Sequence, residues 1–173
     1  MSTEITNDPD KRHFAFAINL AVRNEWDNID LLRSSVQNCF LAVFADVDGC
    51  NAVAMVTGEL LENAIKYGDW SQPSSPQQFR LDVKGDAEKS VVTVSSPTAP
   101  EGKHLDNLMQ ILKWIDEQES PAAAYQAKLL AIAAGEIEAD SGLGLVRMAY
   151  EGNCTFSAAV EDGCLTVAAE IKL

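Results

Sequence analysis

Hydrophobic residues recur along this chain with two periods, and the periods predict an order of strands and helices. In residues 14–20 every second position is strongly apolar, which is the pattern of a strand with one buried face. In residues 29–43, and again in about 51–67, apolar positions recur every three or four residues, as they do in amphipathic helices. The first third of the chain therefore predicts one strand followed by two helices.

The same two periods continue through the rest of the chain. Strand alternation returns in four segments that form two hairpins, 79–83 with 92–94 and about 154–159 with 165–173. Helical spacing returns in residues 105–115, in residues 125–132 and in a short helix opened by Gly142. Ser120 and Pro121 have the arrangement of a helix cap followed by proline at the first helical position.

This order of elements predicts an α+β fold. Runs of strands alternate with runs of helices, which is typical of a two-layer sandwich with helices on one face of a mixed, mostly antiparallel sheet. The length of 173 residues suits one hydrophobic core. We expect a loose tail at residues 1–12 and a single domain at 13–173, with a helical insertion at about 103–140.

Charge narrows the classes of partner. The net charge is −13, which repels nucleic acid and anionic membranes, so we expect neither as a partner. No apolar run reaches the ~18 residues of a membrane span, and residues 1–13 lack the apolar segment of a signal peptide. The four cysteines show no CxxC pair, which favours reduced thiols and a cytoplasmic location.

The first candidate for chemistry is the segment TGELLENAIKYG, residues 57–68. Glu59, Asn63 and Lys66 lie at i, i+4 and i+7, so they share one stripe of the predicted helix. A carboxylate and an amide oxygen on one stripe suit a site for metal-bound phosphate. Taken alone, the stripe fits a solvated helix face equally well.

The second candidate is the segment SGLGL, residues 141–145. Glycines that enter a helix allow backbone N–H groups to approach an anion, and the helix N-terminus favours negative charge. A glycine-rich turn without any ligand is the alternative interpretation of this segment alone.

Together the two segments resemble one family. GELLENAIKYG resembles the N box, and DSGLGLVRMA the last glycine box, of the GHKL (histidine-kinase-like) ATPases. The order of the two boxes, the helical insertion between them and the closing hairpin are also similar. Within that superfamily the chain is most similar to the bacterial anti-sigma-factor serine/threonine kinases, over residues 14–173. The resemblance implies the histidine-kinase-like ATPase (Bergerat) fold.

The resemblance also implies roles for individual residues. Asn63 would offer its side-chain oxygen to a Mg²⁺ ion that bridges the phosphates of ATP. Glu59 would act as general base towards a serine hydroxyl or water, and Lys66 would lie near the phosphates. The backbone at Gly142, Leu143 and Gly144 would wrap the phosphates, and the insertion would take the place of the ATP lid.

One box of the family is missing. GHKL proteins carry D-x-G-x-G after the hairpin strand, where the aspartate accepts a hydrogen bond from the adenine amino group. In this chain the aspartate position falls on Ser96, and the nearest following glycine is Gly102. Serine also accepts a hydrogen bond, but it is neutral and shorter, and an imperfect partner costs about 1–3 kcal/mol.

Two functions follow from these observations. The first is an ATP-binding regulator that resembles the anti-sigma kinases, takes ATP and Mg²⁺ as cofactors, and phosphorylates a Ser or Thr of a protein antagonist during partner switching. The alternative is a degenerate, non-catalytic module of the same fold that docks a protein partner. Alanines at 122–124 and after Leu130 favour close helix packing, for which a homodimer is one interpretation.

Overall fold

The computed structural model describes residues 14–21, 26–44, 46–71, 78–86, 88–98, 103–138 and 142–173. The predicted tail at 1–12 lies outside them. The elements are β1 (Phe14–Ala21), α1 (Asp27–Phe44), α2 (Val47–Tyr67), β2 (Gln78–Gly85), β3 (Lys89–Pro97), α3 (Lys103–Asp116), α4 (Pro121–Ala133), α5 (Leu143–Glu151), β4 (Cys154–Glu161) and β5 (Cys164–Lys172). Their order is the predicted one.

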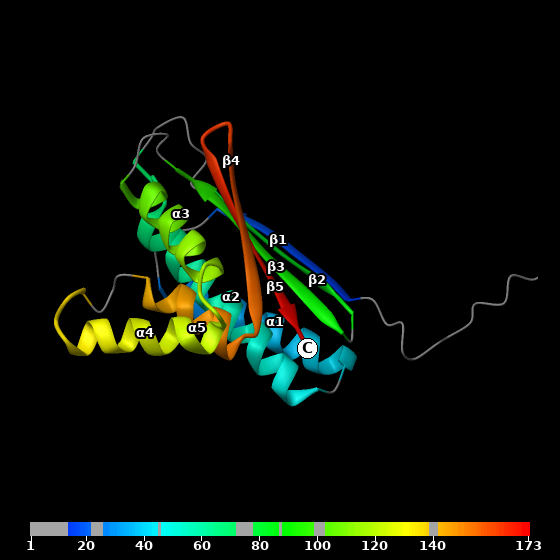
Figure 1. Cartoon of the computed structure of the whole chain (residues 1–173). Helices are drawn as coiled ribbons and strands as arrows, with labels where there is room; N and C mark the ends of the chain where they lie inside the picture. The colour runs from blue at the N-terminus through cyan, green and yellow to red at the C-terminus, as the bar shows by residue number, and fades with distance from the viewer. Residues whose placement is uncertain are drawn as a thin grey trace, which may run out of the picture.

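The strands form one sheet with the spatial order β1-β2-β3-β5-β4. All four pairings between the described strands are antiparallel, where a mixed, mostly antiparallel sheet was expected. The helices lie on one side of this sheet (Figure 1). The α+β fold and its two-layer arrangement are therefore confirmed. No helix within the described residues has the length and apolarity needed to cross a bilayer.

The core lies between the sheet and α2. Alternate residues of β3, from Ser90 to Ser96, are buried, as strand periodicity requires. On β2 the buried side chains are Phe79, Leu81 and Val83, and α2 contributes a wide apolar stripe centred on Leu61. This stripe fixes the rotation of α2, so its opposite, polar stripe is held at a defined angle to the sheet.

The start of α2 differs from the prediction. The helix was expected from about residue 51, but it begins at Val47. Asp46 is the cause, because its carboxylate accepts hydrogen bonds from the backbone N–H groups of Asp48 and Gly49. This N-cap satisfies donors that the first turn leaves unpaired and extends the helix by about one turn.

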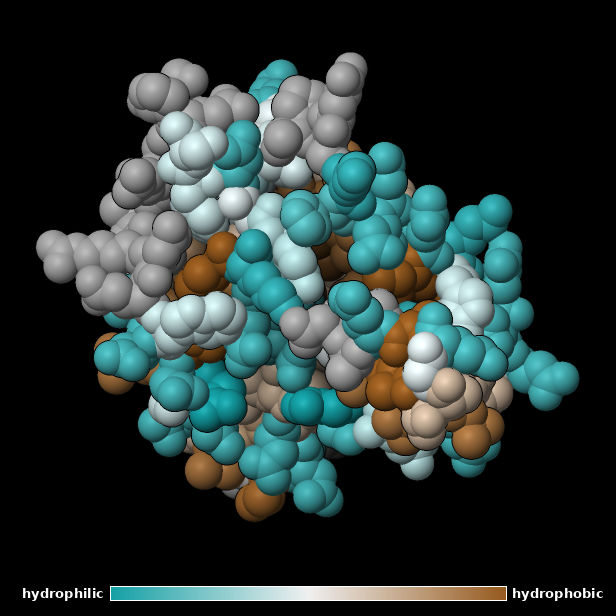
Figure 2. Space-filling view, turned by 90° about the vertical axis from the view of Figure 1, so that its left-hand side faces the viewer, coloured by the Kyte–Doolittle hydropathy of each residue, from teal (hydrophilic) through white to brown (hydrophobic). Residues whose placement is uncertain are grey.

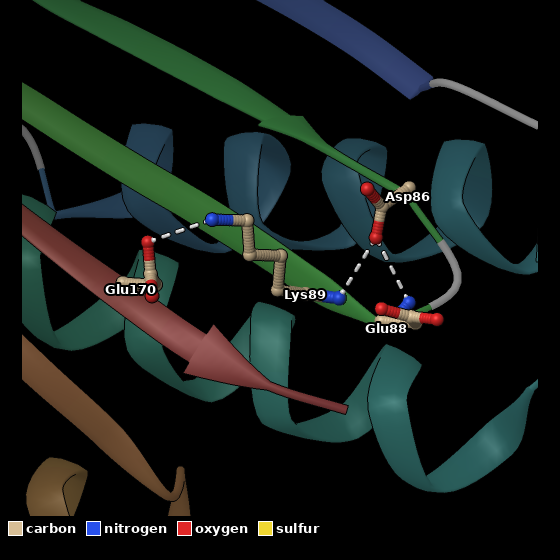
Figure 3. A network of polar contacts seen from close by, with 4 residues as sticks. All are labelled: Asp86, Glu88, Lys89 and Glu170. Carbon is tan, nitrogen blue, oxygen red and sulfur yellow. Dashed lines mark hydrogen bonds and ion pairs between the residues drawn. The ribbon is translucent and has the colours of Figure 1, made fainter.

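The turn between β2 and β3 is fixed by a second aspartate (Figure 3). Asp86 Oδ1 accepts hydrogen bonds from the backbone N–H of Glu88 at 2.9 Å and of Lys89 at 3.0 Å. The Lys89 ammonium then reaches across to the neighbouring strand, 3.3 Å from Glu170 Oε2 on β5. These contacts lie at the end of the hairpin remote from Ser96 and hold its register.

The predicted helical insertion contains α3 and α4. Ser120 caps α4 as expected, since its hydroxyl accepts a hydrogen bond from Ala123 N at 3.1 Å, and Pro121 occupies the first turn. α4 packs mainly against α5 and projects away from the sheet (Figure 1). The two helices of the insertion therefore have different surroundings, and only α3 lies along the face of α2 that carries the predicted site.

Candidate functional site

A pocket of about 290 Å³ opens between α2, α3, the start of α5 and the ends of β3 and β5. α2 supplies its polar wall, and α3 supplies a mixed wall of three apolar and two polar residues, namely Leu105, Leu108, Ile111, His104 and Asn107. β3 and β5 supply the floor through Val94, Ser96, Leu165 and Val167. These floor residues lie on one face of neighbouring strands, because the register places Ser96 opposite Leu165 and Val94 opposite Val167.

The pocket brings together residues that are far apart in the sequence. Seven of the eight predicted site residues line it, namely Glu59, Asn63, Lys66, Ser96, Gly142, Leu143 and Gly144. The eighth, Gly102, lies outside the described residues. The two segments singled out in the sequence thus face each other across one cavity, although more than 70 residues separate them in the chain.

Glu59 is a partly buried carboxyl group of the pocket wall, and its pKa is shifted. Its side chain is 19% exposed, and its Oε1 lies 3.1 Å from Nη2 of Arg147 on α5. Burial raises the pKa of the Glu59 carboxyl above its ordinary value, Arg147 opposes this rise, and the nearby Glu62 and Glu151 add to it. A carboxylate with a raised pKa is a stronger base than an ordinary one.

Arg147 is a site residue that the sequence argument missed. It lies one turn into α5, and its Nε is 3.3 Å from Glu151 Oε2, a contact without hydrogen-bond geometry. The i, i+4 spacing of Arg147 and Glu151 was visible in the sequence, but the contact with Glu59 was not. Arg147 therefore connects the two predicted boxes through one ion pair.

The start of α5 presents backbone donors to the pocket. Gly142 is the N-cap residue, has a left-handed backbone with φ 82°, and provides no side-chain cap. Among the residues that the structure describes, Gly142 gives these first N–H groups no side-chain cap, and such groups are the ones that a ligand or water can take. A Cβ at Gly144 would come within 2.5 Å of Glu59 Oε2, so glycine is needed for the helix start to approach that carboxylate.

The outer end of the polar wall contains a cluster of a cation and two rings. Lys66 Nζ lies 5.3 Å from the centre of the Tyr67 ring, and that ring lies 5.1 Å from the ring of His104 on α3. Lys66, Tyr67 and His104 all line the pocket. The cluster joins the end of α2 to the start of α3, so it closes one side of the cavity.

The β3–β5 floor of the pocket is apolar apart from the hydroxyl of Ser96, and Thr98, which follows β3, adds a second hydroxyl to the lining. Leu105, Leu108 and Ile111 of α3 face the β3–β5 floor across the pocket. Ser96 on this floor is 5% exposed. A flat, apolar ring with one polar edge group matches these surroundings, whereas a strongly charged group does not.

The polar groups at the mouth fit a phosphate with a divalent cation. Backbone N–H groups at the start of α5 and the guanidinium of Arg147 are donors, and the amide oxygen of Asn63 is a neutral acceptor of the kind that Mg²⁺ prefers. Within the described residues there is no cluster of three or more His, Cys, Asp or Glu side chains that would hold a metal by itself. A cation here would need ligands from a bound molecule as well.

Comparison with known proteins supports the fold. No protein-family model and no curated protein matches the sequence. A solved structure of the SiaB–SiaC complex from Pseudomonas aeruginosa contains a similar chain, with 16% sequence identity, 91% of this chain and 89% of that chain covered, and a TM-score of 0.64. At this identity the likeness shows a shared fold over nearly the whole chain.

Proposed function

We propose that this chain is an ATP-binding regulatory protein of the GHKL type, which transfers phosphate from Mg-ATP to a Ser or Thr of a protein antagonist in a partner-switching system. One observation carries the proposal. The pocket holds Glu59 and Asn63 of α2 opposite the uncapped start of α5, which supplies a base, a cation ligand and phosphate donors in one cavity. These are the parts that phosphoryl transfer needs.

The start of α5 binds the phosphates in this proposal. Leu143 and Gly144 offer backbone N–H groups in the direction that favours negative charge, and the left-handed Gly142 leads the chain into that position. Asn63 holds the cation through its side-chain oxygen. When bound, Mg²⁺ and ATP supply the phosphoryl group and neutralise its charge.

The floor and α3 bind the base of the nucleotide. Val94, Leu165 and Leu108 cover its faces, and the Ser96 hydroxyl accepts a hydrogen bond from its exocyclic amino group. This hydroxyl is a weaker partner than a carboxylate, so we expect ATP affinity to be modest. The 5% exposure of Ser96 compensates in part, because water competes poorly for a buried hydroxyl.

Glu59 takes the proton of the attacking hydroxyl. Its burial raises the carboxyl pKa above the ordinary value, which makes it a stronger base, and Arg147 at 3.1 Å keeps it oriented towards α5. A protein hydroxyl is the intended acceptor, and water takes its place when no partner is bound. The similar chain from Pseudomonas aeruginosa was solved in a complex of two proteins, which supports a protein as partner.

A second candidate function is a non-catalytic docking module of the same fold. The observation that favours it is the position of the acidic residues that line the pocket. Glu59 and Glu62 are both on α2, so neither lies on the floor where the base of a nucleotide would bind. The β3–β5 floor offers only the neutral Ser96 for base recognition. A module of this kind would bind its partner without turning over nucleotide.

Turnover of Mg-ATP separates the two candidates. We expect slow phosphate release from Mg-ATP by the wild-type chain, and a loss of about 10²–10⁴-fold in Glu59→Gln, because the amide no longer accepts a proton. Asp48→Asn is the matched control, since Asp48 is an exposed carboxylate on the same helix that does not line the pocket. We expect it to retain activity close to that of the wild type.

Two results would contradict the proposal. Equal activity in Glu59→Gln and the wild type would remove Glu59 from the chemistry. Binding of Mg-ATP without any turnover, measured with the partner-free chain and with an added hydroxyl acceptor peptide, would favour the non-catalytic module.

A further inference from the structure

The carboxylate of Glu59 lies at the start of α5, in the place that the proposed function gives to the phosphates. Its two oxygens approach different parts of that helix. Oε1 is 3.1 Å from Nη2 of Arg147, and Oε2 is so near Gly144 that a Cβ on this glycine would come within 2.5 Å of it. The chain therefore holds an anion of its own where a ligand anion would bind.

Arg147 has donors left over for a second anion. Its side chain is 41% exposed and lines the pocket. A guanidinium carries several N–H donors, of which Nη2 faces Glu59. Nε is buried and makes no hydrogen bond within the part of the chain that the structure describes, because its 3.3 Å contact with Glu151 Oε2 lacks the required geometry. A buried N–H without an acceptor is unfavourable, so this pairing leaves the guanidinium incompletely satisfied.

A phosphate needs a local cation to enter this protein. The net charge is −13, and hydrophilic side chains predominate on the side of the molecule that Figure 2 shows. A net charge of this sign repels phosphates at a distance. The lysine and arginine side chains that line the pocket are Lys66, which lies at its outer end beside the Tyr67 ring, and Arg147 on α5. Arg147 is thus the cation next to the backbone donors proposed for the phosphates.

A carboxylate and a phosphate compete for this guanidinium. Burial raises the pKa of the Glu59 carboxyl, Arg147 opposes the rise, and the nearby Glu62 and Glu151 add to it. A phosphate at the start of α5 would bring more negative charge beside Glu59. Arginine binds phosphate in a bidentate manner, and the higher charge of a phosphate makes it a stronger partner than one carboxylate.

We propose that Arg147 binds a phosphate of the nucleotide and releases Glu59 in exchange. This inference rests on the proposed function, because it requires a nucleotide in the pocket. The guanidinium turns from the carboxylate to the phosphate oxygens, and Glu59 is then free to accept the proton of the attacking hydroxyl. The ion pair between α2 and α5 therefore keeps the base occupied until a phosphate is in place.

A double-mutant cycle separates this exchange from a simpler role, in which Arg147 only neutralises Glu59. If Arg147 has to leave Glu59 to bind the phosphate, Glu59→Gln frees the guanidinium and strengthens nucleotide binding most when Arg147 is present. If Arg147 only neutralises the carboxylate, Glu59→Gln strengthens binding most when Arg147 is absent, because the unpaired carboxylate then repels the phosphate. The two roles thus predict interactions of opposite sign.

Calorimetric titration with Mg-ATP measures the cycle in the wild type, Glu59→Gln, Arg147→Met and the double variant. We expect Glu59→Gln to bind about tenfold more tightly than the wild type, but less than about threefold more tightly when it is added to Arg147→Met. Glu62→Gln is the matched control for general repulsion, since Glu62 is an exposed carboxylate that lines the same pocket. It should change the affinity by the same factor with and without Arg147. Far-ultraviolet circular dichroism verifies folding, and Arg147→Gln replaces Arg147→Met if the latter is unfolded.

The outcomes distinguish this exchange from the proposed function. Equal gains from Glu59→Gln in the two backgrounds, or a larger gain in Arg147→Met, would overturn the exchange alone, because Mg-ATP would still bind. No binding of Mg-ATP by any of the four proteins would overturn the proposed function and the exchange together. Glu59→Gln should also bind Mg-ATP more tightly while it turns over more slowly, a combination that loss of packing between α2 and α5 would not produce.

Discussion

At the scale of single residues, Glu59 has the surroundings that decide what the pocket can do. A carboxylate that is 19% exposed needs a compensating group, and Arg147 provides it at 3.1 Å. The same arginine contacts Glu151, so its guanidinium is held between two carboxylates. Burial and Arg147 thus act on the pKa of Glu59 in opposite directions, because burial raises it and the guanidinium lowers it.

Replacing Arg147 by an uncharged residue should raise the pKa of Glu59. In Arg147→Met the opposing cation is lost, so the pKa of Glu59 rises further above its ordinary value. Because Glu59 is a base only when deprotonated, phosphate transfer would then begin at higher pH. The carboxyl ¹³C resonance of Glu59, followed by NMR during a pH titration, measures the shift without relying on activity. Arg147→Lys keeps the positive charge, so the pKa of Glu59 in this variant should stay close to its wild-type value.

An unchanged titration midpoint in Arg147→Met would contradict the electrostatic role. It would mean that the ion pair between α5 and α2 only packs the two helices together. Loss of activity in that variant would then have a structural cause.

At the scale of elements, the start of α5 depends on a backbone conformation that only glycine adopts easily. Gly142 has φ 82°, and a Cβ there would collide with the Ile111 side chain of α3. Gly135 has a similar φ of 72°, but a Cβ there would meet nothing within 4 Å. Substitutions at the two glycines can therefore distinguish the effect of backbone strain, which is common to both, from the effect of crowding against Ile111, which occurs only at Gly142.

Alanine at each glycine tests this difference. A left-handed alanine destabilises both variants by about 1–2 kcal/mol. Gly142→Ala is destabilised by a further ~1–3 kcal/mol, because its Cβ must displace Ile111. Urea unfolding monitored by circular dichroism measures the two changes in the free energy of unfolding. Gly142→Ala should also weaken Mg-ATP binding, whereas Gly135→Ala should not. Equal destabilisation by the two substitutions would show that Ile111 yields without cost.

Most elements were predictable from the sequence, and the exceptions have local causes. The strand alternation around Leu81 and Val94 and the helical period of α1 were clear because each element has one buried face. The start of α2 was missed because the carboxylate of Asp46 caps it from a segment that resembles a turn. Ser120 shows the opposite case, where the cap followed by proline was recognised correctly.

At the scale of the whole molecule, the sequence predicted the members of the site better than their contacts. The resemblance to the GHKL boxes selected Glu59, Asn63 and Gly144, and the fold brings them to one cavity. The ion pair between Glu59 and Arg147 joins α2 to α5 and depends on how the two helices pack on the sheet. No periodicity within either helix contains that information, so this contact needed the three-dimensional structure.

The central claim is that this cavity binds Mg-ATP through Asn63, and calorimetric titration of ATP tests it most directly. We expect the wild type to bind more tightly with Mg²⁺ than without, and Asn63→Ala to lose at least about tenfold in affinity, or ~1.4 kcal/mol, in the presence of Mg²⁺. Asn51→Ala is the matched control, because Asn51 is an exposed asparagine on the same helix that bonds Gln37 and does not line the pocket. Equal Mg-ATP affinity in the two variants, or no binding by the wild type at millimolar ATP, would contradict the claim.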